Sequence, residues 1–240
     1  SPHELTVRPK EKEGLQSKRH ARLDPMSKQS ADYVPNWAMV QLHATNILVA
    51  HQPTTLTINL KSPCSQKNLE LWAQLPPNVS TQLQEPAIRS KLKELHNGPL
   101  RVRLWEGELK PALARKIGIL LNFKNAGVHE LSIRLQSLIE KTPAEKWNVL
   151  CPVYQVTTIP TKNSKMSDRF NFNGKFALKN IFHNLAYASG QIIMLPETVV
   201  DDFVQLGLYD ESYDEVLNSV CRQLGLQSNT AYGVTIVFKN

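Results

Sequence analysis

Residues 191–206 read QIIMLPETVVDDFVQL, and the chain continues with GLYDESYDEVLNSVCRQLGL. The apolar run QIIMLP predicts a strand. Pro196 fits the first turn of a helix, and the apolar residues after it recur at helical spacing. Ser212 and Glu215 then have the spacing of a capping box at the start of another helix. These signals predict a strand–helix–helix unit over about residues 190–226.

The apolar side chains of this unit recur at the spacing of buried faces. We predict that they pack in the core or in a dimer interface: Ile193, Leu195, Val199, Phe203, Val216 and Val220. Residues 197–215 contain seven acidic side chains and no Lys or Arg, and this charge would repel phosphate. The unit is therefore better suited to packing or dimerisation than to reading DNA.

Residues 54–60, TTLTINL, alternate polar and apolar side chains, which is typical of a strand with one wet face. Thr55, Thr57 and Asn59 lie on the polar face, and Thr and Asn side chains can hydrogen-bond to base edges. Lys61 follows the strand and can contact a phosphate. We predict that this strand contacts DNA bases. The alternative is the solvent face of an ordinary sheet.

The remaining patterns interleave helices and strands without a regular β-α-β repeat. Helical spacing and caps predict helices at residues 62–75, 85–98, 111–123, 128–141 and 176–188. Runs rich in β-branched and aromatic residues predict strands at residues 99–107, 147–160 and 233–239. We therefore expect a single α+β domain over residues 36–240.

The net charge of +7 and the pI near 9.3 make a polyanion the first partner to consider, either nucleic acid or an anionic membrane surface. Residues 1–35 are polar and carry four prolines, so we predict a flexible basic arm. A solvated tail without a partner is the alternative. The predicted phosphate contacts lie in this arm and on one face of the strand at residues 99–107: Lys18, Arg19, Arg22, Arg101 and Arg103.

Residues 161–180 combine five basic side chains and one aspartate with three phenylalanines. In an alternative nucleic-acid site, the cations would neutralise phosphates while Phe170 or Phe172 stacks on an exposed base. The residues of this alternative loop are Lys162, Lys165, Arg169, Phe172 and Lys175. The competing interpretation is a lysine-rich surface loop whose phenylalanines are buried.

The sequence contains no familiar catalytic or cofactor-binding signature, such as G-x-S-x-G, a phosphate-binding glycine loop or H-E-x-x-H. Cys64, Cys151 and Cys221 form no C-x-x-C pair, which argues against a zinc site and a disulfide framework. No run has the length of a membrane span, and the first residues lack the apolar core of a signal peptide. We expect a cytoplasmic protein with no enzymatic activity, cofactor, metal, small-molecule substrate or membrane partner.

The segment IIMLPETVVDDFVQLGLYDESYDEVLNSV, residues 192–220, resembles the ribbon-helix-helix family of DNA-binding regulators. The resemblance implies that strands from two subunits pair into a ribbon that enters the major groove. The length, the basic arm and this ribbon-like pattern are also similar to AcaB-like regulators carried by conjugative plasmids and integrating conjugative elements. That resemblance implies a dimeric transcriptional activator of transfer genes.

The resulting hypothesis is a homodimeric, sequence-specific regulator of transcription that binds double-stranded DNA. Two other classes of protein stay open. An RNA- or single-strand-binding nucleoprotein would use residues 161–180. A membrane-associated assembly protein would place the basic arm on anionic lipid and the acidic residues 197–215 on a basic partner.

Overall fold

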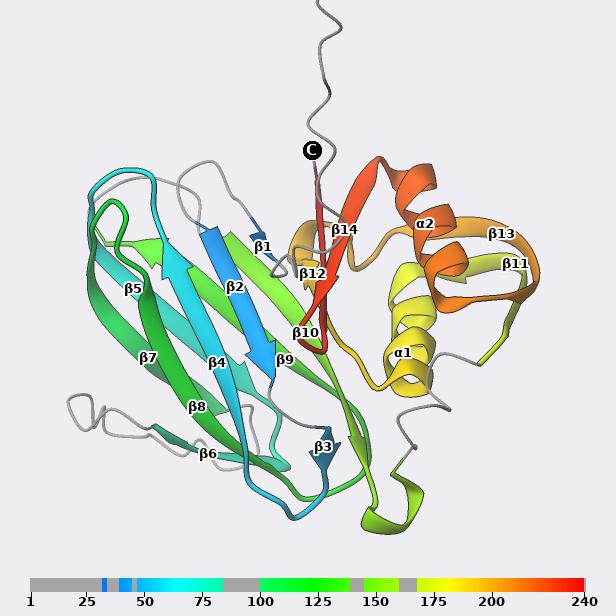
Figure 1. Ribbon diagram of the computed structural model, residues 1–240, viewed down its shortest axis with the longest axis horizontal. Coiled ribbons are helices and arrows are strands. Elements are labelled where there is room, and N and C mark those ends of the chain that lie inside the picture. Colours follow the sequence, from blue (N-terminus) through cyan, green and yellow to red (C-terminus); the bar gives the residue numbers. More distant parts are fainter. Residues whose placement is uncertain are drawn as a thin grey trace, which may run out of the picture.

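The computed structural model describes residues 32–33, 39–44, 47–83, 100–138, 145–159 and 168–239. These residues form mostly β-strands, together with two α-helices (Figure 1). A five-stranded sheet, here called the first sheet, has the strand order β1-β2-β4-β8-β6. Its strands are β1 (Asp32–Tyr33), β2 (Met39–Ala44), β4 (Thr54–Lys61), β8 (Arg115–Phe123) and β6 (Val79–Leu83).

A larger second sheet has the strand order β14-β15-β12-β10-β9-β5-β7, and β3 (Leu48–Val49) pairs with β10 in parallel. The strands in this order are β14 (Leu226–Ala231), β15 (Val234–Lys239), β12 (Ile192–Pro196), β10 (Glu145–Tyr154), β9 (Gly127–Ser137), β5 (Gln66–Leu75) and β7 (Leu100–Leu109). The two sheets pack face to face. Their inward side chains, such as Ile58 of β4 and Leu71 of β5, form one buried core.

A layer of helices covers the outer side of half of the second sheet (Figure 1). It consists of α1 (Leu178–Ser189) and α2 (Tyr213–Leu224). A third sheet, made of β11 (Phe170–Ala177) and β13 (Phe203–Glu211), packs on these helices. Two single 3-10 turns complete the described structure: η1 (Val156–Thr158) and η2 (Glu197–Val199). A second core therefore lies between the second sheet, the helices and the third sheet.

The alternating pattern at residues 54–60 is confirmed as strand β4. Leu56, Ile58 and Leu60 are buried, while the intervening Thr55, Thr57 and Asn59 are half-buried on the outer face, although Thr54 is buried too. The predicted strands near residues 99–107, 147–160 and 233–239 are also present, as β7, β10 and β15. Alternation identified β4 because one face of it packs into a core, whereas β10 and β15 are largely buried on both faces and were identified by their β-branched and aromatic residues.

Three predicted helices are wrong. Residues 62–75, 111–123 and 128–141 contain the strands β5, β8 and β9. In β9, for example, Leu131, Ile133 and Leu135 are buried at every second residue. Apolar residues four apart satisfy both a helical and a strand period, so these patterns were ambiguous. Pairing with neighbouring strands on both sides decides in favour of the strand.

The predicted helix after Pro196 is also wrong. The chain makes the short turn η2 and then enters strand β13, in which Val204 and Leu206 are buried while Phe203 and Gln205 are exposed. In a helix, the acidic and apolar side chains of this segment would be distributed around the helix axis. As a strand, the segment instead lays its apolar face on the helix layer.

The other helical predictions in this region are confirmed. Helix α1 occupies residues 178–189, close to the predicted 176–188. Helix α2 begins with the predicted capping box, since the Ser212 side chain accepts from the Glu215 backbone N–H and the Glu215 carboxylate accepts from the Ser212 backbone N–H. Local hydrogen bonding of this kind depends on few residues, so it is readable from sequence.

The α+β assignment with a ribbon-helix-helix unit is therefore wrong, because the described chain is mostly β-sheet and β12 is followed by a strand. Strand β12 lies inside the second sheet between β10 and β15. Both of its edges are paired within the chain, so it is not available to form a ribbon with a second subunit.

Some predictions fall outside the described residues. They include most of the arm at residues 1–35, the helix at residues 85–98 and the segment at residues 160–167. Among the described residues, neither helix has the length and the apolar composition that crossing a membrane requires.

Candidate functional site

The residues predicted to contact bases lie on the outer face of the first sheet. Thr55, Thr57 and Asn59 belong to β4, which pairs with β2 on one side and with β8 on the other. The sheet presents these side chains from a central strand rather than from a two-stranded ribbon. They are half-buried, and Thr55 and Asn59 already have partners within the protein.

The residues predicted to contact phosphate are divided between separate places. Arg101 and Arg103 lie on β7, on the outer face of the second sheet, which is the opposite side of the sandwich from Thr57. A straight duplex cannot lie on both outer faces at once. The other predicted phosphate contacts, Lys18, Arg19 and Arg22, are outside the described residues.

Exposed Lys and Arg side chains cluster at one end of the sandwich. Residues 62–65 connect β4 to β5, and residues 110–114 connect β7 to β8. The registers that pair Leu60 with Arg115 and Gln66 with Leu109 bring the two connections together. The exposed cations at this place, here called the basic end, are Lys61, Lys67, Lys110, Arg115 and Lys116.

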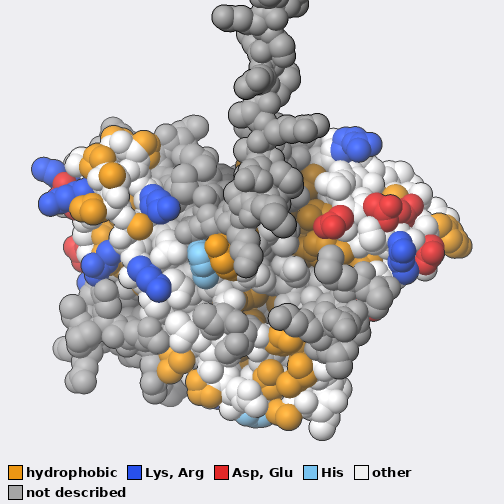
Figure 2. Space-filling view, viewed as in Figure 1, with side chains coloured by type: hydrophobic (Ala, Val, Ile, Leu, Met, Phe, Trp, Pro, Cys, Tyr) orange, Lys and Arg blue, Asp and Glu red, His pale blue; other side chains and the backbone are white. Residues whose placement is uncertain are grey.

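The basic end has a strong excess of positive charge. Residues 60–67 and 108–116 contain five basic side chains and one acidic side chain, Glu108, so their net charge is 5 − 1 = +4. Figure 2 shows Lys and Arg side chains concentrated at this end of the sandwich, on the left of the view. Leu113, which is 62% exposed, lies among them. Lys61 is the one member of the group that sequence reasoning selected.

The alternative nucleic-acid loop loses its stacking residue. Phe172 is 6% exposed and packs edge-on against Phe176 beneath β11. Arg169 donates to the Asp210 carbonyl oxygen over 3.2 Å, and Lys175 lies over the Phe203 ring. The buried interpretation of the phenylalanines is therefore correct. Lys162 and Lys165 lie outside the described residues.

The residues predicted for packing or dimerisation have two different environments. Five of them lie in the core between the second sheet, the helices and the third sheet: Ile193, Leu195, Val199, Val216 and Val220. Phe203 is instead 59% exposed on the outer face of the third sheet. The apolar stripe therefore stabilises this chain itself.

Arg103 belongs to a hydrogen-bonded network around a buried carboxylate. Glu70 is 6% exposed, and its oxygens accept from Arg103 over 3.1 Å, from Trp72 Nε1 over 3.0 Å and from Gln136 over 2.9 Å. Burial alone would raise the pKa of Glu70, but these hydrogen bonds and the charge of Arg103 hold it below its usual value. Glu106 also pairs with Arg103, over 2.8 Å. Arg103 is thus neutralised within the fold.

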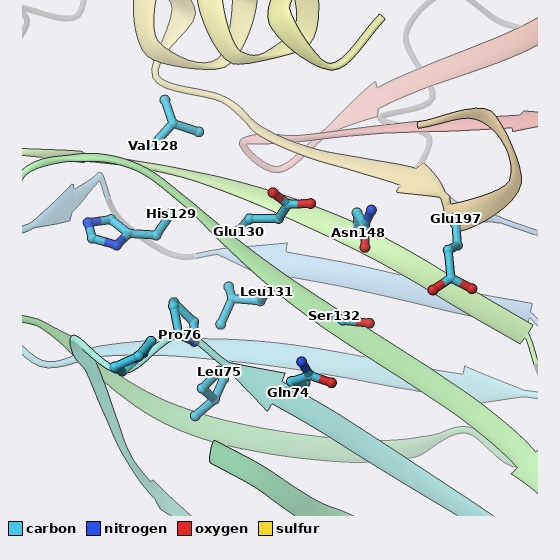
Figure 3. A pocket seen from close by; sticks show the side chains of 11 residues that line it. Gln74, Leu75, Pro76, Val128, His129, Glu130, Leu131, Ser132, Asn148 and Glu197 are labelled. Atoms are coloured by element: carbon cyan, nitrogen blue, oxygen red, sulfur yellow. The ribbon is translucent and has the colours of Figure 1, made fainter. Parts of the chain in front are cut away.

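Beside this network lies a cavity of about 540 Å³ on the outer face of the second sheet (Figure 3). Gln74, Ser132 and Asn148 come from three neighbouring strands and form its polar floor. Glu130 and Glu197 also line it, and each pairs with a lysine: Glu130 with Lys179 over 2.5 Å and Glu197 with Lys146 over 2.9 Å. Prolines 76 and 77 and Val128 supply an apolar rim.

Sequence reasoning missed this cavity because it placed Trp72 and Gln74 in one helix and Ser132 in another. Only strand register brings these residues together. The four further cations of the basic end were missed for the same reason, since they come from two connections far apart in sequence.

Comparison with known proteins adds no assignment. No protein-family model and no curated protein matches the chain, so the similarity to AcaB-like regulators stays a prediction.

Proposed function

We propose that the protein is a non-catalytic regulator that binds double-stranded DNA, with the basic end in contact with the phosphate backbone. The observation that carries this proposal is the clustering of Lys61, Lys67, Lys110, Arg115 and Lys116 at one end of the sandwich. A cytoplasmic location and a homodimer that places two basic ends on one duplex belong to the same proposal.

Phosphate neutralisation supplies the affinity in this proposal. The side chains of Lys61, Lys67, Lys110 and Lys116 have no hydrogen bond or ion pair with any other described residue. Their charges are therefore not offset by neighbouring carboxylates. Each cation that neutralises a phosphate releases a condensed counterion, which makes binding dependent on salt with a slope of about −0.9 per contact.

The outer face of β4 continues the basic end. Asn59 lies directly opposite Lys116 in the register of β4 and β8, and Thr57 follows on the same face. Polar side chains next to phosphate-contacting lysines are suited to base contacts. Sequence specificity is thus assigned to Thr55, Thr57 and Asn59, and affinity to the lysines.

The first experiment is selection of bound sequences from a random duplex library at physiological salt, together with affinity measurements at several salt concentrations. We expect an enriched motif. Lys61→Gln with Lys116→Gln should make the negative slope of log K against log salt shallower by about 2. The control variant, Arg222→Gln with Lys239→Gln, removes two exposed cations from α2 and β15 and should leave the slope unchanged.

The result of this experiment distinguishes sequence-specific duplex binding from the alternatives. Retention without an enriched motif would remove the sequence-specific part of the proposal. Equal effects of the two double variants would remove the basic end from it. The single-strand alternative would need a preference for single strands, but its stacking residue Phe172 is buried.

A further inference from the structure

The half of the second sheet that the helices leave open carries polar side chains in cross-strand rows. Strand register aligns one row from β7 to β10: Arg103, Trp72, Arg134 and Lys146. The adjacent row contains Arg101, Gln74, Ser132 and Asn148. Because alternate residues of a strand share a face, both rows point away from the sandwich core.

The two rows contain more cations than the described carboxylates neutralise. Arg103 pairs with Glu70 and Glu106, and Lys146 pairs with Glu197. Arg101 and Arg134 have no ion pair with any described residue, and Arg134 Nε is buried without a hydrogen-bond partner among these residues. Arg134 also lies directly opposite Lys146, a like-charge pair that an anion would relieve.

These two arginines line a cavity of about 150 Å³, whose walls include Trp72 and Ser132. Arg101 lies 5.1 Å from the centre of the Trp72 ring, and this stacking orients its guanidinium group. Gln74, Ser132 and Glu197 line both this cavity and the larger one in Figure 3. The two cavities are therefore parts of one groove across β5, β9 and β10.

We propose that this groove binds an acidic saccharide, whose carboxylate or phosphate group lies between Arg101 and Arg134. The hydroxyl groups of the saccharide contact Gln74, Ser132 and Asn148 in the larger cavity. This site is separate from the basic end and does not depend on the DNA-binding proposal.

The chemistry of the lining residues selects this ligand class. Guanidinium groups bind carboxylates and phosphates through charge-assisted hydrogen bonds. Amide and hydroxyl side chains both donate and accept, and Glu130 and Glu197 accept, which matches a row of hydroxyl groups. The apolar rim of Pro76, Pro77 and Val128 suits the C–H face of a sugar ring.

The test is titration of the protein, labelled with ¹⁵N on its tryptophan side chains, with four probes followed by NMR. The probes are glucuronic acid, glucose 6-phosphate, glucose and inorganic phosphate, and Trp72→Phe assigns the reporting indole signal. We expect saturable shifts of the Trp72 signal with glucuronic acid or glucose 6-phosphate. Glucose and inorganic phosphate should bind at least about tenfold more weakly, because each lacks half of the interactions.

Two variants connect the shift to the site. Arg134→Gln should weaken binding of the acidic sugar by about tenfold, and Arg101→Gln, at an exposed position, should do the same. Lys61→Gln with Lys116→Gln is the matched control and should leave sugar binding unchanged. Conversely, Arg101→Gln should leave duplex DNA binding unchanged.

Four results would overturn the proposal. Three are the absence of a saturable Trp72 shift with both acidic sugars, equal binding of glucose, and equal binding of inorganic phosphate. The fourth is displacement of the sugar by duplex DNA, since the groove would then be part of the DNA surface. Failure of DNA binding alone would leave the saccharide result intact, so the two proposals fail separately.

Discussion

The sandwich and the helix-covered unit share the second sheet, but they carry opposite charge. Residues 60–67 and 108–116 at the basic end have a net charge of +4 by sequence, whereas residues 197–215 contain seven acidic side chains and no basic one. Cations from other segments offset part of the acidic charge, as in the pair between Lys146 and Glu197. The net charge of +7 is therefore divided unevenly between the basic end and an acidic pole at residues 197–215. An anionic partner is expected only at the basic end.

The two regions also differ in the layers that enclose their cores. Strands face strands in the sandwich, whereas helices lie between two sheets in the other region. Strand β10 contributes to both, because Val149 points into the sandwich core and Leu150 into the helix-covered core. The shared sheet therefore couples the two regions, and we expect them to unfold together.

The largest expected effect tests this coupling. Phe123 in the sandwich core and Phe182 in α1 are both fully buried. Phe123→Ala and Phe182→Ala should each lower the free energy of unfolding by about 3–5 kcal/mol, through lost burial and the cavity left behind. Urea denaturation followed by circular dichroism and tryptophan fluorescence measures this loss. A separate early transition in only one variant would show that the regions unfold independently.

The next effect concerns the carboxylate that the sandwich face buries. Glu70→Gln should lower the free energy of unfolding at pH 7 by about 1–3 kcal/mol, because it weakens charged hydrogen bonds to Arg103, Trp72 and Gln136. The pKa of Glu70 is lowered in the folded state, so its stabilisation is present above the unfolded pKa and is lost as the pH falls through the folded pKa.

The free energy of unfolding, measured from neutral to acidic pH, tests this pH dependence. The variant should lose less stability than the natural protein between neutral and acidic pH. Glu106→Gln is the control, since its side chain is 45% exposed and also pairs with Arg103. An equal effect of both variants would show that burial of Glu70 is unimportant.

A smaller effect belongs to the helix-covered unit. Ser212→Ala removes the side-chain oxygen that accepts from the Glu215 backbone N–H and should cost about 1 kcal/mol. Chemical denaturation is again the measurement, and Ser65→Ala, at an exposed connection in the basic end, is the control. A loss as small as that of the control would mean that helix α2 does not need its cap.

The smallest effect compares the two poles directly. Asp201→Asn with Asp214→Asn removes two exposed charges from the acidic pole and should change duplex affinity by no more than about twofold, because exposed charges far from the DNA are screened by salt. Fluorescence anisotropy with a labelled duplex measures this. A larger gain in affinity would place the acidic pole next to the bound DNA.

Particular residues show why sequence patterns succeeded in some segments. The alternation around Ile58 and the capping box of Ser212 and Glu215 depend on periods and bonds within a few residues. They survive in the fold because local preference and core burial agree there. Helix α1 was predicted correctly for the same reason.

The failures have a shared physical cause. Leu131 and Leu135 are four residues apart, a spacing that fits one face of a helix and one face of a strand equally well. Partner strands decide between them, and the partners of β9 lie in β5 and β10. The helix predicted after Pro196 is wrong for a similar reason, since β13 is a strand that pairs with the distant β11.

The sequence by itself determined the net positive charge, the alternating strand at residues 54–60 and the two helices. Tertiary structure alone decided that five cations from two connections form one basic end, and that Arg101 and Arg134 line one groove. Charge and local periodicity are properties of neighbouring residues. Strand register joins residues that are far apart in the chain, and the burial of whole sheets selects it.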